Sequence, residues 1–136
     1  MILESDIVKI MLDGRVLDAF TDEFGTEQPE LGQQILYFDE AEYEGRFVCV
    51  RAQGGAYNTS YYQRPSIAIY VAGLKTKSDA YVTKAIADRI NVFFQTTKSS
   101  GGVTTLIPQS PSPAAMFTES GRPVYELFFD VIYKTT

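Results

Sequence analysis

The side chains best suited to chemistry are four carboxylates that lie close together in sequence: Asp39, Glu40, Glu42 and Glu44. Paired carboxylates can serve as general acid and base, and carboxylate oxygens are ligands that Mg²⁺ accepts. No Asp-x-Asp-x-Asp-Gly loop accompanies them, and acidic residues in a polar connection are usually solvated. We therefore expect surface charge here, and a small carboxylate- or metal-dependent hydrolase is the alternative from the enzyme class.

Other reactive residue types are scarce. The chain has no histidine, which removes the commonest general base, the Ser-His and Cys-His nucleophile pairs and the commonest zinc ligand. Its single cysteine, Cys49, lies in an alternating apolar segment, where a small buried hydrophobe is expected rather than a reactive thiol. Neither a phosphate-binding Gly-Lys-Ser/Thr loop nor a dinucleotide glycine pattern occurs. We expect no catalytic residue, no cofactor and no metal.

A tyrosine-rich stretch remains as a candidate binding feature: Tyr57, Asn58, Tyr61, Tyr62 and Arg64. Tyrosine and arginine are enriched at protein interfaces because each combines a large contact surface with a polar tip. An ordinary surface loop with half-buried rings fits the same residues, and an aromatic platform for single-stranded nucleic acid is a third interpretation. The net charge of −5 disfavours the third, since affinity for phosphates comes mainly from Lys and Arg.

Two helices are predicted to support these residues, over 5–20 and 78–96. Ser5 and Ser78 are candidate N-caps, and Gly14 is a candidate close contact. The second helix carries an apolar stripe, with Lys84, Asp88, Asn91 and Gln95 on the opposite side.

Strands are predicted at 35–38, 46–51, 65–72, 103–108, 114–118 and 124–133. The strands at 46–51 and 65–72 are expected to form an antiparallel hairpin with Gly54–Tyr57 at its tip. In the last strand, Phe128 and Ile132 interrupt the polar face and lie either under a helix or against another subunit. The fold class is α+β, a mainly antiparallel sheet covered by two helices, in one domain over 1–136.

Composition adds limits on the class of protein. The 136 residues, 45% of them hydrophobic, suffice for one core. No apolar run reaches the ~20 residues of a membrane-spanning helix. The N-terminus lacks the pattern of a secretion signal, so we expect a protein made in the cytoplasm.

The segments 47–51, 64–73 and 121–133, together with the Gly54–Gly55 connection and the helix from Ser78, resemble the phage tail terminator and minor-capsid proteins. The resemblance is one of layout and covers roughly residues 3–134. It implies a late structural protein of the virion that forms a hexameric ring on the tail tube, ends tube elongation and joins the tail to the head. The implied partners are copies of itself, the major tail tube protein and the head–neck connector protein.

The resemblance also implies a place for the acidic charge, because DNA crosses the lumen of the tail and a negative wall keeps it from sticking. On this interpretation Tyr57, Asn58, Tyr61, Tyr62 and Arg64 contact neighbouring subunits or the tube. Another neck or tail-completion protein is the nearest alternative, and a monomeric ligand-binding module is a further one.

Overall fold

The computed structural model describes residues 3–22, 24–39, 41–58, 62–96, 103–108 and 115–134. The elements, in chain order, are α1 (Leu3–Asp13), β1 (Phe20–Thr21), β2 (Glu27–Gln28), β3 (Gly32–Ile35), β4 (Phe47–Asn58), β5 (Tyr62–Ala72), the 3₁₀ turn η1 (Lys77–Asp79), α2 (Ala80–Thr96), β6 (Val103–Pro108), β7 (Ala115–Phe117) and β8 (Pro123–Lys134).

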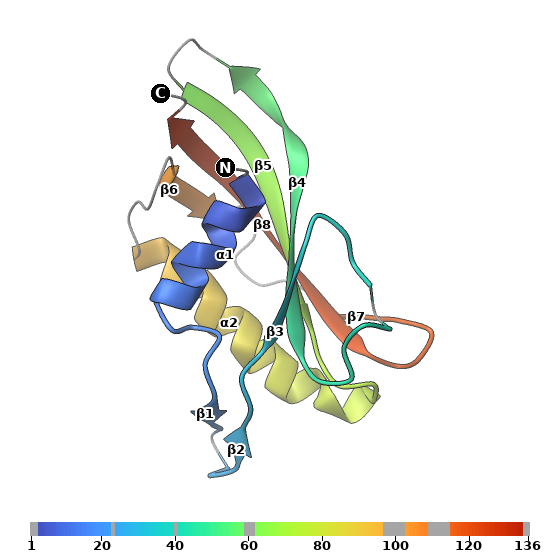
Figure 1. Ribbon diagram of the computed structural model, residues 1–136. Helices are drawn as coiled ribbons and strands as arrows, with labels where there is room; N and C mark the ends of the chain where they lie inside the picture. The colour runs from blue at the N-terminus through green and yellow to red at the C-terminus, as the bar shows by residue number, and fades with distance from the viewer. Residues whose placement is uncertain are drawn as a thin grey trace.

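One curled sheet carries most of the chain (Figure 1). Its strand order is β3-β4-β5-β8-β6, and β7 pairs with the beginning of β8. The β3–β4 pair is parallel, and the other pairs in this sheet are antiparallel. Strands β1 and β2 form a separate small hairpin. The predicted α+β class with a mainly antiparallel sheet is confirmed.

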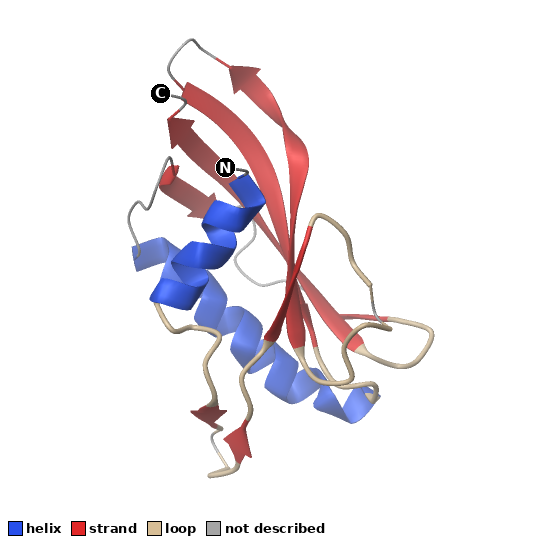
Figure 2. Ribbon diagram, in the orientation of Figure 1, coloured by secondary structure: helices blue, strands red, loops and turns tan. Residues whose placement is uncertain are grey.

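Both helices lie on the same side of this sheet (Figure 2). The alternation seen in the sequence accounts for this, because Ile67, Ile69 and Val71 of β5 point with Leu127 and Phe129 of β8 into the core beneath the helices. Phe94 of α2 meets Phe129 edge-on with ring centroids 5.3 Å apart. We call the side without helices the outer face of the sheet.

The first helix is shorter than predicted and begins earlier. It starts at Leu3, so Ser5 lies within its first turn and is not the N-cap. It ends at Asp13: the Gly14 N–H still donates to the Ile10 carbonyl at 3.0 Å, but Arg15 has a φ of 58° and cannot continue the helix. The predicted close contact at Gly14 is confirmed, since a Cβ there would lie 2.3 Å from a ring carbon of Phe93.

The second helix follows the prediction more closely. The turn η1 precedes it and contains Ser78, so Ser78 is not the N-cap; Thr76 is the N-cap residue of η1 and makes no side-chain capping hydrogen bond. Lys84 and Asp88 pair across one turn at 3.0 Å on the exposed side. Asn91 was predicted on that side as well, but it is buried.

Two strand boundaries differ from the prediction. Strand β3 ends at Ile35 instead of starting there, and Leu36 follows it with a φ of 79°. The polar residues of β3 do not follow the apolar pattern from which strands are predicted. Gln34 can nevertheless be buried, because its side-chain amide forms hydrogen bonds with both the N–H and the carbonyl of Asp39. The 53–63 segment, predicted as a connection, is mostly strand, so Gly54–Tyr57 is not the hairpin tip. Shifts in the β4–β5 register around Gly55 accommodate the extra residues.

Candidate functional site

The acidic stretch forms ordinary loop contacts. The Asp39 carboxylate accepts a hydrogen bond from the Ala41 N–H at 3.0 Å. Glu44 is exposed and pairs with Lys75 at 3.3 Å, and Glu40 lies outside the described residues. Within the described part of the chain, no three His, Cys, Asp or Glu side chains are grouped so that they could hold a metal ion. The geometry of this stretch is that of surface charge.

Cys49 is enclosed beneath the connection between β3 and β4. Its side chain is fully buried, and its Sγ donates to the Tyr37 carbonyl at 3.2 Å. Burial raises the pKa of the Cys49 thiol to about 11, and the charge of Arg51 offsets only part of this effect.

We expect Cys49 to be unreactive in the folded protein. At pH 8, a pKa of about 11 leaves roughly one thiol in a thousand ionised, and burial blocks access to that fraction. Titration with a thiol-reactive chromophore is the measurement: labelling is expected only after denaturant is added, to one thiol per chain. Rapid labelling of the native protein would contradict this expectation.

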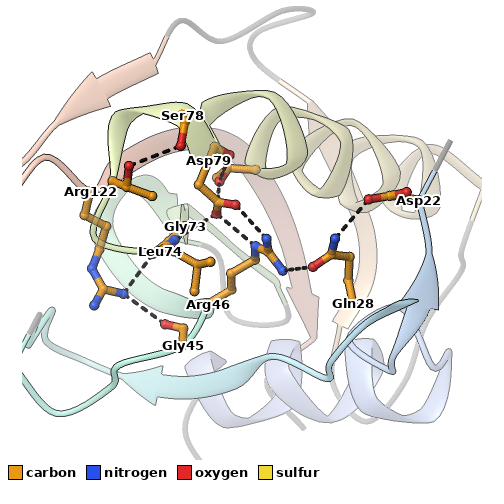
Figure 3. Close-up of polar contacts among 11 residues, drawn as sticks. Asp22, Gln28, Gly45, Arg46, Gly73, Leu74, Ser78, Asp79 and Arg122 are labelled. Carbon is orange, nitrogen blue, oxygen red and sulfur yellow. Dashed lines mark hydrogen bonds and ion pairs between the residues drawn. The ribbon is translucent and has the colours of Figure 1, made fainter. Parts of the chain in front are cut away.

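A buried ion pair that sequence reasoning missed joins the start of β4 to the start of α2 (Figure 3). The guanidinium of Arg46 binds the carboxylate of Asp79 twice, at 2.9 Å through Nε and at 2.6 Å through Nη2. Asp79 also accepts the Leu74 N–H at 2.8 Å. Arg46 Nη1 donates to Gln28 at 2.6 Å, and the Gln28 amide donates to Asp22 at 2.9 Å. This network ties the β1–β2 hairpin to the core.

A second arginine, Arg122, is completely buried at the start of β8. Its Nη1 donates to the carbonyls of Gly45 and Gly73 at 3.0 and 2.9 Å, and its Nη2 donates to that of Tyr43 at 2.6 Å. Its guanidinium carbon lies 5.0 Å from the ring centroid of Phe47. Because protein groups enclose both guanidiniums, Arg46 and Arg122 hold segments together and are not placed to bind a substrate.

The connection that Arg122 holds covers part of the outer face. Phe38, Tyr43 and Tyr70 pack there on a small second core of Phe47, Ala72 and Val124. Beside it lies an open groove of about 360 Å³, which we call the outer groove. The outer groove is lined by Phe38, Arg51, Tyr70, Met116, Phe117, Thr118 and Val124.

Large apolar side chains are exposed at and near this groove. Met116 and Phe117 are 47% and 48% exposed, and Phe128 is 38% exposed. Phe128 therefore does not lie under a helix, because its neighbours Leu127 and Phe129 take the helix side. The Ile132 side chain lies outside the described residues. Aromatic residues, Met and Arg are the types enriched in interface cores, so this surface is suited to contact another protein.

The far end of the β4–β5 hairpin is a second feature, which the backbone alone defines. Strand β3 pairs only with Phe47–Val50, so no described strand covers the edge of β4 beyond them. Figure 1 shows β4 and β5 reaching past the helices at this end.

The backbone of this hairpin brings most of the sequence-predicted site residues together. Tyr57 and Asn58 end β4, and Tyr62 and Arg64 lie at the start of β5. Tyr61 and the side chains of the other four lie outside the described part, so their contacts stay a prediction.

Comparison with known protein families assigns most of the chain. Residues 16–135 match the family described as phage tail termination protein. No curated protein matches the chain significantly. Of the described helices, none is long and apolar enough to cross a membrane. Since the match covers both the curled sheet and α2, the chain belongs to the phage tail termination proteins, which are structural components of the bacteriophage tail.

Proposed function

We propose that this protein caps the tail tube as a ring, ends tube elongation and provides the surface that joins tail to head. The family match over residues 16–135 is the observation that carries the proposal. Two features support it, the outer groove and the end of the β4–β5 hairpin, which reaches past the helices in Figure 1. A protein that acts by assembly needs such surfaces and needs no reactive side chain.

The ring we propose is a homohexamer. Closed rings use a heterologous interface, in which one patch of a subunit meets a different patch of its neighbour. The other proposed partners are the major tail tube protein and the head–neck connector protein, with assembly in the host cytoplasm. DNA passes through the lumen without specific binding, and the net charge of −5 favours free passage by repelling phosphate.

Electron microscopy of polymerising tail tubes tests the proposal. Tube protein is polymerised with and without this protein, and tube length and tube ends are compared. We expect shorter tubes with a ring of density at one end. Continued elongation and bare ends at saturating protein would refute the capping role.

We also propose that the hairpin end contacts the neighbouring subunit or the tube. Truncation of Tyr61 and Tyr62 to alanine is expected to weaken assembly at least tenfold, because truncating an interface tyrosine commonly costs more than about 1 kcal/mol. The fraction of capped tubes is measured against protein concentration. Tyr37→Ala is a matched control, since Tyr37 is an exposed tyrosine of the β3–β4 connection. Capping by the double variant at wild-type concentrations, with an unchanged melting temperature, would exclude this contact.

A further inference from the structure

The β1–β2 hairpin presents an apolar side chain to solvent. Phe24, between the two strands, is 76% exposed, although its ring touches that of Tyr81 with centroids 5.6 Å apart. Single exposed apolar side chains are common on protein surfaces, so the case for a contact at Phe24 rests on how the turn holds it and on what could receive it.

The turn that carries Phe24 is ordered by Asp22. The carboxylate of Asp22 accepts hydrogen bonds from the backbone N–H of Phe24 and of Thr26, both at 2.9 Å, and from the side chain of Gln28. Gly25 adopts a φ of 81°, which the turn requires. The hydrogen bonds, led by the one from Gln28, lower the pKa of Asp22, so this carboxylate is charged at neutral pH.

The same hairpin is anchored to the core through Gln28, Arg46 and Asp79 (Figure 3). Phe24 is therefore held on a preorganised support, which reduces the entropy lost when it binds. The hairpin and the chain that leaves it carry two exposed carboxylates, Glu27 and Glu30, while the cation Arg89 lies at its base on the ring of Phe20.

The outer groove offers apolar and cationic side chains that could receive Phe24 and the carboxylates of the hairpin. Its walls are aromatic or thioether side chains, among them Phe38, Tyr70 and Met116. Two cations border it: Arg51 lines it, and the Lys77 ammonium lies 5.9 Å from the centroid of Phe117. Neither cation forms a salt bridge with a described residue. Two carboxylates of β8 also lie on this face: Glu126 hydrogen-bonds Tyr70, and Asp130 accepts a hydrogen bond from the Ser66 hydroxyl at 3.0 Å.

We infer that the outer groove of one copy receives the β1–β2 hairpin of a second copy. Phe24 enters between Phe38, Tyr70 and Met116, and the acidic flank of the hairpin faces Arg51 and Lys77. The inference rests on the proposed ring and supplies its interface. The groove opens on the outer face of the sheet, and the hairpin projects beneath the opposite, helix-covered side (Figure 1). Each copy can therefore contact two neighbours, as a heterologous assembly requires.

Sedimentation of the purified chain tests the inference. We expect wild-type protein to self-associate below about 1 mM, the weak limit for a specific contact. Phe24→Asp removes the inserted ring, and Met116→Asp places a carboxylate in the groove. Each variant alone is expected to associate at least tenfold more weakly than wild type.

An equimolar mixture of the two variants is the decisive sample. The Phe24→Asp chain keeps an intact groove, and the Met116→Asp chain keeps an intact hairpin. The hairpin of the second can enter the groove of the first, but no further copy can add, so the mixture is expected to form a dimer and nothing larger. Leu12→Asp is the control, because Leu12 is an exposed apolar residue of α1 outside both patches. It is expected to associate as wild type does. Circular dichroism melting checks that each variant is folded.

Four results would overturn the inference: wild-type monomer at 1 mM (about the weakest specific affinity), unchanged association of a folded Phe24→Asp or Met116→Asp variant, no dimer in the mixture, or equal loss in Leu12→Asp. The tube assay distinguishes failure of this inference from failure of the proposed capping function.

If wild-type protein caps tubes and Phe24→Asp caps them equally well, the inference alone is overturned. Wild-type protein that self-associates through these patches but leaves tubes uncapped overturns the capping role alone.

Discussion

Replacement of Arg122 by methionine is expected to lower the free energy of unfolding by about 3–4 kcal/mol. Methionine fills much of the same volume but donates no hydrogen bond. The carbonyls of Tyr43, Gly45 and Gly73 then lose their donor, and each buried acceptor left unsatisfied costs about 1–3 kcal/mol. Because partly buried carbonyls can recover water, the total lies below the sum of the three.

Urea denaturation followed by circular dichroism measures this loss, with a fall in melting temperature of roughly 10 °C. Arg122→Lys is expected to recover only part of the stability, since one ammonium cannot replace the fork of a guanidinium. Arg89→Met is the control. Arg89 is exposed and stacks on Phe20, a contact expected to contribute no more than about 1 kcal/mol.

The effect of Arg122 should extend to the outer face. Its hydrogen bonds hold the β3–β4 connection, which carries Phe38 into the wall of the outer groove. In Arg122→Met, backbone amides between residues 36 and 46 are expected to exchange hydrogen faster than those of β5. Wild-type stability together with unchanged exchange would show that Arg122 does not hold this connection.

Replacement of Asp79 by alanine is expected to destabilise the fold by about 3–5 kcal/mol. The change leaves the Arg46 guanidinium buried without its counter-charge and removes the acceptor of the Leu74 N–H. An exposed pair behaves differently: Asp88→Ala, which breaks the Lys84–Asp88 pair, is expected to lose no more than about 0.5 kcal/mol.

The double variant Arg46→Met/Asp79→Leu separates the ion pair from the volume it fills. Removing both charges leaves neither one unpaired, so the double variant is expected to be more stable than Asp79→Ala. Chemical denaturation of Arg46→Met, Asp79→Leu and the double variant gives the free energies of unfolding to compare. Losses in the two single variants that simply add up in the double variant would show that Arg46 and Asp79 act independently.

The sequence alone was sufficient for the parts of the fold that repeat locally. The alternation of Tyr125, Leu127 and Phe129 predicted the last strand, and the stripe of Ile86, Ile90 and Phe94 predicted the second helix. Both patterns work because side-chain direction follows directly from backbone periodicity. The absence of histidine likewise excluded Ser-His and Cys-His nucleophile pairs without any structure.

Strand boundaries were less predictable where pairing overrides composition. Gly54 and Gly55 resemble turn residues, yet β4 continues through them because β5 pairs alongside with shifted register. Strand β3 contains two glutamines and was displaced in the prediction. The backbone of β3 is hydrogen-bonded to its parallel partner β4, and the Gln34 side chain is hydrogen-bonded to Asp39. Neither interaction can be recognised from the local sequence.

The fold class and the family could both be predicted from sequence: one α+β domain without histidine, with a layout similar to tail terminators. Which residues meet became clear from the packing of the elements. Arg46 and Asp79 are separated by 33 positions, and Arg122 and Gly45 by 77. The outer groove likewise joins Arg51, Tyr70 and Met116 from three strands. Such contacts depend on how the elements pack, and the periodicity of a single segment carries no information about its partner.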